Sequence, residues 1–323
     1  MQNLKNKKVK NCLLCHNTKL KSVFNLGNFF ISNFVSKDKI HRGLKAPLHL
    51  LFCNQCELIQ LSHIAPQELM YKKFYWYRSG ITQTMRDGLK DIFYESLKHV
   101  KLTRDDVVVD IGANDGTLLK NYKSKGYVTV GCEPAKNLKN ELKKNCNYLI
   151  NDFWSKKSLD KVIKKNNLKK PKIITAIGMF YDLENPNLFI KDAALSLHED
   201  GVFIAQLMCL NSMLKKNDIG NICHEHIEFY SNNSLKFLFE KNGLEIFKIE
   251  ENEINGGSYR IFCRKLKNGS INLKKENVLK SIKQFKKRSE SNKLNIIKSI
   301  INKYLLLLSE VKTSMENIQL EQE

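Results

Sequence analysis

The chain has 323 residues and a formal net charge of +21, a length that favours two domains or one large domain with attachments. No segment approaches the ~20 apolar residues of a membrane helix, and the start MQNLKNKKVKN lacks the apolar run of a signal peptide. Nine cysteines are too few for a disulfide scaffold at this length. We therefore expect a cytoplasmic protein with no membrane span. The charge is nearly all lysine spread along the chain, which favours solvated surfaces over a nucleic-acid track.

Two CxxC pairs stand in the first segment. A CxxC turn presents two sulfurs to one ion, and four thiolates complete a tetrahedral zinc site. The pairs leave no ligand position open, so they predict one structural zinc in a domain over residues 1–72, with His16 as a bystander. The predicted metal ligands are Cys12, Cys15, Cys53 and Cys56.

From Thr84 onward the pattern alternates between amphipathic helices and short β-branched runs. This alternation predicts an α/β domain over 73–270 with a doubly wound sheet of seven strands. The seventh strand follows the sixth after a short loop and is expected to be antiparallel. Strands are expected over 107–111, 127–134, 148–152, 173–180, 201–207, 244–250 and 258–265, and helices over 85–100, 117–122, 137–145, 159–167, 187–197 and 234–243.

Residues 271–323 are predicted to form a helical C-terminal extension. An apolar stripe along it needs a partner surface. Docking on its own domain is favoured slightly over a homodimer contact. The stripe comprises Ile296, Ile297, Ile300, Ile301, Tyr304, Leu305 and Leu308.

The run DIGANDG follows the first strand of the predicted sheet, where such folds bind ligands. The glycines Gly112 and Gly116 allow close approach of the backbone, and Asn114 lies between them. Asp110 and the neighbouring Asp115 would repel a phosphate and accept a cationic ligand. The loop therefore differs from a dinucleotide-binding motif.

Further polar residues stand at the ends of the next two strands. Glu133 can accept both hydroxyls of a ribose, while Asp152 can take an adenine amine and Phe153 can stack on its ring. In register with DIGANDG, this set resembles the S-adenosylmethionine site of class I methyltransferases.

Taken in order, the CxxC pairs, DIGANDG, GCEPA, ICHEHIEFY and NGGSYR make 12–264 resemble the sugar C-methyltransferases of deoxysugar biosynthesis. Members combine an N-terminal zinc-binding domain with a class I, Rossmann-like methyltransferase domain. They methylate carbon 3 of a nucleotide-linked 4-keto-6-deoxy sugar. The resemblance thus implies a nucleotide-sugar substrate, with S-adenosylmethionine and zinc as cofactors.

Methylation of carbon needs an enolate, and so a base and a group that stabilises the oxyanion. The resemblance places His224, Glu225 and His226 over the pocket, with His226 as the base and Glu225 orienting it. It also implies that Tyr75 and Tyr77 bond substrate oxygens. Arg78 could meet a phosphate, and Arg260 of NGGSYR offers a second arginine for a diphosphate.

The HEH run has other interpretations. Alternate residues of an extended chain share a face, so His224 and His226 could chelate a metal, with Cys223 as a third ligand. They could also be two solvent-facing histidines, and the tyrosine segment could be an interdomain strap.

Three features depart from the family. Cys223 stands where the best-known members have a tyrosine, and the region 178–182 lacks their histidine after the fourth strand, which leaves Tyr181 or Asp182 as substitutes. Members usually continue into a further α/β domain, whereas the corresponding part of this chain is predicted to be helical.

Two other functions stay open. An RNA or DNA methyltransferase is motivated by the zinc and the charge, but IGMFYDLENP lacks the NPPY-like motif that it predicts. A non-catalytic protein that binds S-adenosylmethionine and zinc would result if truncation had silenced the fold. Nucleic acid is not the expected partner.

Overall fold

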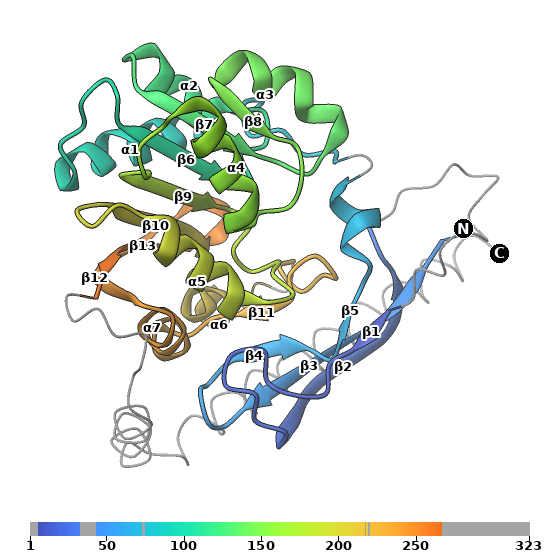
Figure 1. Ribbon diagram of the computed structural model, residues 1–323. Coiled ribbons are helices and arrows are strands. Elements are labelled where there is room, and N and C mark those ends of the chain that lie inside the picture. Colours follow the sequence, from blue (N-terminus) through green and yellow to red (C-terminus); the bar gives the residue numbers. More distant parts are fainter. Residues whose placement is uncertain (1–5, 33–42, 73–74, 217, 219, 267–323) are drawn as a thin grey trace.

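The structure is a computed structural model that describes residues 6–32, 43–72, 75–216, 218 and 220–266. A small N-terminal β-region lies beside a larger α/β body (Figure 1). The helical extension expected over 271–323, with its apolar stripe, lies outside the described residues.

One sheet of seven strands forms the centre of the α/β body. Its strands are β6 (Val107–Ile111), β7 (Val128–Cys132), β8 (Tyr148–Ile150), β9 (Ile173–Ile177), β10 (Val202–Met208), β12 (Leu244–Asn252) and β13 (Ser258–Lys265). Their spatial order is β12-β13-β10-β9-β6-β7-β8. The strands from β10 to β8 pair in parallel, and β13 is antiparallel to both of its neighbours. The predicted Rossmann-like sheet and its antiparallel seventh strand are confirmed.

Helices cover both faces of this sheet. They are α1 (Gln83–His99), α2 (Thr117–Ser124), α3 (Lys139–Asn145), α4 (Lys156–Asn166), α5 (Pro186–Ser196), α6 (Leu210–Lys216) and α7 (Asn232–Lys241), with 3₁₀ turns η3 (Lys136–Leu138) and η4 (Ile254–Gly256). Val108 packs with Leu89 of α1 on one face. Val107 and Val109 pack with Phe189 of α5 on the other. Because both faces are buried, β6 is a continuous apolar run.

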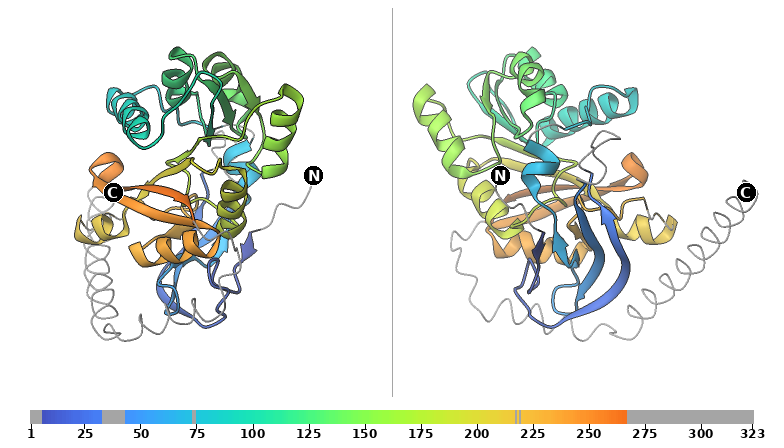
Figure 2. Two further views of the ribbon diagram at one scale, coloured as in Figure 1. Left: turned by 60° about the vertical axis from the view of Figure 1, so that its left-hand side comes forward. Right: turned by 90° about the vertical axis from the view of Figure 1, so that its right-hand side faces the viewer.

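The N-terminal region contains β1 (Lys7–Lys8), β2 (Leu20–Phe30), β3 (Lys45–Cys53), β4 (Ile59–Leu61) and β5 (His63–Ile64). Its four-stranded sheet has the order β11-β4-β3-β2, and the outer strand β11 (Glu228–Phe229) comes from the α/β part of the sequence. The HEH run therefore leads directly into a strand of the N-terminal sheet. Figure 2 shows the blue N-terminal strands beside the orange segment that contains α7.

The chain passes between the two parts through a π-helical turn, η2 (Glu68–Lys72), and an extended segment that reaches α1. None of the described helices is both long and apolar enough to span a membrane.

Candidate functional site

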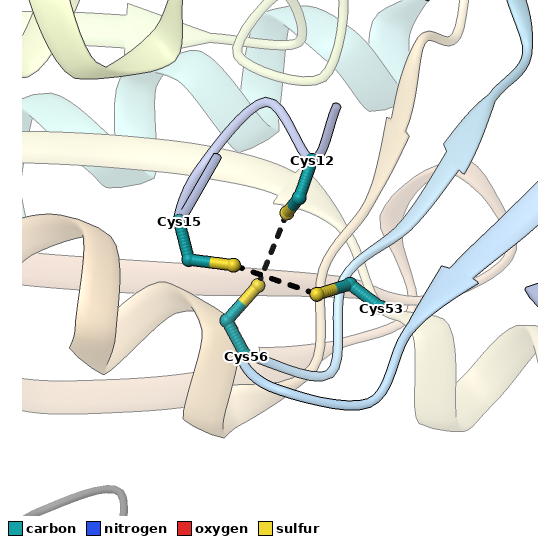
Figure 3. A group of neighbouring side chains, drawn as sticks. All are labelled: Cys12, Cys15, Cys53 and Cys56. Atoms are coloured by element: carbon teal, nitrogen blue, oxygen red, sulfur yellow. Dashed lines mark hydrogen bonds between the residues drawn. The ribbon is translucent and has the colours of Figure 1, made fainter. Parts of the chain in front are cut away.

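The four predicted zinc ligands point toward one another (Figure 3). Their Sγ atoms all lie within 4.8 Å of one another, with 3.3 Å between Cys12 and Cys56 and 3.5 Å between Cys15 and Cys53. Four sulfurs at this spacing fit a tetrahedral zinc with Zn–S bonds of about 2.3 Å. The donor set thus fits the structural zinc predicted from the sequence.

Both CxxC turns have the same backbone. The N–H of His16 donates to the carbonyl of Cys12 at 3.0 Å, and the N–H of Glu57 donates to that of Cys53 at 2.9 Å. His16 and Glu57 both adopt left-handed φ values, 61° and 62°. The repeated turn explains why sequence spacing alone predicts this site.

The first CxxC turn is anchored to the α/β body. The Asn187 side chain on α5 donates to the carbonyls of Leu13 and Leu14 at 2.8 and 3.0 Å. The Lys241 ammonium on α7 donates to Leu14 at 2.7 Å. The zinc-binding part is therefore fixed against the helices of the larger part.

A cavity of about 620 Å³ opens at the carboxyl ends of β6, β7 and β9, and segments 64–68 and 75–79 form part of its wall. This is where a doubly wound sheet binds its ligands. Lys7 is the one basic side chain among the described lining residues, and it lies 3.4 Å from Glu184. The lining carboxyl groups are Glu68, Glu133, Asp182, Glu184 and Asp192.

Asp110 lies in β6 and is buried. It accepts a hydrogen bond from the Thr175 hydroxyl at 2.6 Å. Burial raises the pKa of Asp110 to about 7, against the effect of that bond. Asp110 lines a smaller cavity that shares Gly112 with the larger one, so its proton responds to charge placed there.

The loop after β6 provides a close backbone approach. Gly112 has φ +69°, and a Cβ there would lie 2.7 Å from Cγ of Met179. Asn114 lines the cavity and donates through its side chain to the carbonyl of Tyr77 at 3.1 Å. Gly116 caps α2 and packs on Asn145 without lining either cavity, so its role is to place the helix.

Glu133 is a buried carboxylate in the cavity wall. It accepts backbone N–H groups from Asn114 at 2.9 Å and from Ala135 at 2.8 Å. Burial raises the pKa of Glu133, and the two bonds oppose that effect. Each oxygen keeps a lone pair for a ligand hydroxyl.

Asp152 and Phe153 follow β8. The Asp152 side chain forms an ion pair with Lys72 of η2 at 3.1 Å. The Phe153 ring lines the cavity beneath the Lys72 ammonium, 5.6 Å from it. The connecting segment thus reaches across the sequence-predicted adenine site.

Tyr75 and Tyr77 line both cavities, and their ring centroids are 6.5 Å apart. The Asn137 side chain bonds the N–H and the carbonyl of Tyr75 at 2.9 and 3.0 Å. Burial raises the pKa of Tyr75, so its hydroxyl stays a hydrogen-bond donor.

The HEH residues lie behind the cavity walls rather than among the lining residues. His224 is buried, and its Nε2 lies 3.0 Å from the carbonyl oxygen of Ala46 on β3. His226 bonds the carbonyl of Asn221 through Nδ1 at 2.8 Å. Its ring lies edge-on to Tyr181 at 4.5 Å.

Burial lowers the pKa of His226, and the bond to Asn221 opposes that effect. The imidazole is therefore neutral at pH 7. With Nδ1–H donating, Nε2 carries the lone pair, and no described residue bonds it. Glu225 has a buried Oε2 that also lacks a partner among the described residues.

The two arginines expected near a phosphate are engaged elsewhere. Arg78 pairs with Glu141 at 3.2 Å. Arg260 is buried, pairs with Asp91 at 2.6 Å and donates to Gln206. Arg260 is therefore unavailable to a diphosphate in this structure.

Sequence reasoning missed several lining residues. Met179 follows β9 and Trp154 follows β8. Glu133 was predicted because it lies just after a strand, and the same criterion could have identified Met179 and Trp154. Lys7 and the segment 64–68 come from the N-terminal region, and no local pattern connects them with the cavity.

Comparison with known families gives two matches. Residues 77–249 match a family model described as "Methyltransferase domain". Residues 12–71 match one described as "Putative zinc binding domain". The second match contains all four cysteines of the cluster.

The C-methyltransferase NovU of Streptomyces niveus is 25% identical over 257 residues, which cover 78% of this chain and 60% of NovU. The chain therefore spans about 60% of the length of this curated relative.

Solved structures include two similar chains. One is magnesium protoporphyrin IX methyltransferase from Synechocystis PCC 6803 with bound SAH. It is 12% identical in sequence, the match covers 59% of this chain and 90% of that structure, and the TM-score is 0.43. The PH0226 protein from Pyrococcus horikoshii OT3 has 16% identity, 59% and 95% coverage, and a TM-score of 0.44.

Proposed function

We propose that this chain, which belongs to the methyltransferase domain family, is an S-adenosylmethionine-dependent C-methyltransferase acting on a nucleotide-activated 4-keto deoxysugar. The similarity to a C-methyltransferase supports a carbon acceptor. The observation that carries the proposal is the neutral His226, whose Nδ1 is held by Asn221 while Nε2 has no described partner. A neutral imidazole with an unprotonated nitrogen is the base that a carbon acid needs.

The cofactor site fits S-adenosylmethionine. When bound, this cofactor supplies an electrophilic methyl group on a positively charged sulfur. We assign its ribose hydroxyls to Glu133, its adenine ring to Phe153 and its adenine amine to Asp152. Its amino acid end lies over the loop after β6, where the carboxyl of Asp110 attracts positive charge. The acidic lining of the cavity supports this cationic ligand.

The acceptor is a carbon next to a ketone. Nε2 of His226 removes its proton, and Glu225 tunes this imidazole. The tyrosine hydroxyls of Tyr75 and Tyr77 bond the sugar oxygens. His224, held on Ala46, keeps the HEH run in place. The Tyr181 ring lines the smaller cavity and contacts the ring of His226 at 4.5 Å, so we infer that its side chain shifts when the acceptor binds.

The nucleotide diphosphate lies outside this cavity. Lys7 is the one basic residue in the described lining, and Glu184 pairs with it. A diphosphate inside would face the carboxylates without compensating charge. The sugar therefore enters first and the nucleotide stays at the mouth.

The same lining argues against RNA or DNA as the acceptor. Binding of a phosphate backbone depends on lysine and arginine contacts, and this cavity provides carboxylates instead. The high net charge of the chain does not extend into the site.

A test would incubate the purified protein with methyl-labelled S-adenosylmethionine and a panel of nucleotide-linked 4-keto deoxysugars, with RNA and DNA as controls. Label is expected in one keto sugar. Label in nucleic acid alone would establish the competing function, and cofactor binding without any transfer would establish the non-catalytic alternative.

A further inference from the structure

Asp182 is a cavity-lining carboxyl group for which the cofactor has no use. It lies in the loop between β9 and α5, and its Oδ1 is buried without a hydrogen-bond partner among the described residues. A buried polar atom without a hydrogen-bond partner destabilises the folded protein. Because Asp182 also lines the cavity, its carboxyl group is placed to bond a ligand there.

The backbone around Asp182 is rigidly held. The N–H of Asp182 donates to the carbonyl of Met179 at 3.1 Å. The carbonyl of Tyr181 accepts the N–H groups of Ile227 and Glu228 at 2.8 and 3.0 Å. The loop that carries Asp182 is thus hydrogen-bonded to the two residues that follow His226.

The titratable groups that interact electrostatically with Asp182 come from three segments. They lie on η2 and the segment after it, on the loop of Asp182 itself, and on the HEH run with β11. None of them carries a positive charge. They are Tyr71, Tyr75, Tyr181, Cys223, Glu225, Glu228 and Tyr230.

This setting keeps a proton on the carboxyl group. Burial raises the pKa of Asp182 well above its ordinary value, the charge of Glu225 adds to the rise, and the Tyr71 hydroxyl opposes it. A neutral carboxylic acid in a low-dielectric wall is a strong hydrogen-bond donor to a developing oxyanion.

We propose that Asp182 is a protonated carboxylic acid that donates a hydrogen bond to the ketone oxygen of the acceptor and stabilises its enolate. The inference rests on the proposed function. The carbon next to the ketone gives its proton to Nε2 of His226, and the electron pair moves to the oxygen bonded by Asp182. The pair then returns as carbon binds the methyl group, and the S–CH₃ bond breaks. His226 releases the proton to solvent, and Asp182 keeps its own throughout.

Glu228 provides a matched control. Burial raises its pKa well above its ordinary value, and both of its carboxyl oxygens lack partners among the described residues. Unlike Asp182, it is outside both cavity linings. Glu228→Gln should therefore remove one protonated carboxyl group and leave the carboxyl band of Asp182 in place.

Infrared spectroscopy tests the protonation without any substrate. The spectrum of the wild type minus that of Asp182→Asn at neutral pH is expected to contain a protonated-carboxyl band that shifts in deuterated water. Glu228→Gln should remove a different band. A difference spectrum showing only an ionised carboxylate would overturn the proposal, whatever the enzyme methylates.

Kinetics tests the role. Ionisation of Asp182 should make the turnover of the wild type decline at alkaline pH. The amide of Asp182→Asn still donates a hydrogen bond but does not ionise, so this variant should keep measurable turnover and lose that decline. Asp182→Ala should lose about 10²–10³-fold in kcat while binding cofactor normally. Wild-type turnover by Asp182→Ala would reject the role. If the wild type methylates no keto acceptor, the proposed function and this role both fail, and the infrared band reports only a buried acid.

Discussion

The backbone N–H of Leu61 donates to the carbonyl of Ile227 at 2.9 Å. Leu61 ends β4, the second strand of the hairpin whose turn carries Cys53 and Cys56. Ile227 directly follows His226. The second zinc knuckle and the HEH run are therefore parts of one hydrogen-bonded unit, and the metal supports the segment that we propose for catalysis.

Removal of the zinc should loosen the HEH run. Zinc chelation or Cys56→Ser is expected to reduce amide-exchange protection at Leu61, whose N–H donates to the Ile227 carbonyl. The expected loss is at least tenfold, equivalent to about 1.4 kcal/mol, because β4 loses its anchored turn. Exchange measured by mass spectrometry, beside zinc content, checks this. Cys146→Ser, at a buried cysteine outside the cluster, should leave both unchanged. Full protection in zinc-free protein would disconnect the two sites.

Replacement of the base should separate binding from chemistry. His226→Gln is expected to slow deuterium uptake beside the ketone by about 10²–10⁴-fold and to leave the Kd for S-adenosylmethionine unchanged. His198→Gln, outside both cavity linings, serves as the control. Wild-type exchange in His226→Gln would remove the histidine from the base role.

The decline of activity at acid pH should reflect protonation of the His226 imidazole. Burial favours the neutral imidazole, so the folded pKa of His226 lies below its ordinary 6.5. The neutral imidazole of His226 is the working form. It persists at pH 6.5 and is lost as the pH falls through the pKa of His226 in the folded protein. The contribution of His226 to stability falls in the same window, because the unfolded chain binds the proton more readily. An acid limb above 6.5 would contradict this assignment.

Glu133→Gln should weaken cofactor binding. One of the two backbone N–H groups bonded by the carboxylate would then face an amide N–H, and a ribose hydroxyl would lose a charged acceptor. A loss of about 1.5–3 kcal/mol, or roughly 10–100-fold in Kd, is expected by calorimetry. Glu199→Gln should bind as the wild type. An unchanged Kd for Glu133→Gln would exclude the ribose role.

Cofactor binding should release a proton near neutral pH. Burial raises the pKa of Asp110 to about 7, and an adjacent cationic ligand favours the carboxylate. Binding enthalpies at pH 7 in two buffers of different ionisation enthalpy should differ accordingly, and Asp110→Asn should remove that difference. Buffer-independent enthalpies in the wild type would place the positive end of the ligand elsewhere.

The sequence predicted what depends on local patterns. VVVDI is buried on both faces, and the CxxC turns close on themselves, so the sheet and the zinc cluster followed from periodicity and spacing. The two-residue strand β11 was not predicted, because its pairing partner Gln60 lies far away in the sequence. Arg260 was expected near a diphosphate, yet it meets Asp91 of α1. The setting of Asp182 likewise depends on residues from three segments.

The most direct test of the central claim is carbon-13 NMR of the product formed from ¹³C-methyl S-adenosylmethionine and a nucleotide-linked 4-keto deoxysugar in deuterated water. The account predicts a labelled methyl group coupled to a ring carbon beside the ketone, with deuterium at that carbon in unmethylated substrate recovered from the reaction. A labelled methyl group on oxygen, or on no sugar at all while cofactor is bound, would contradict it.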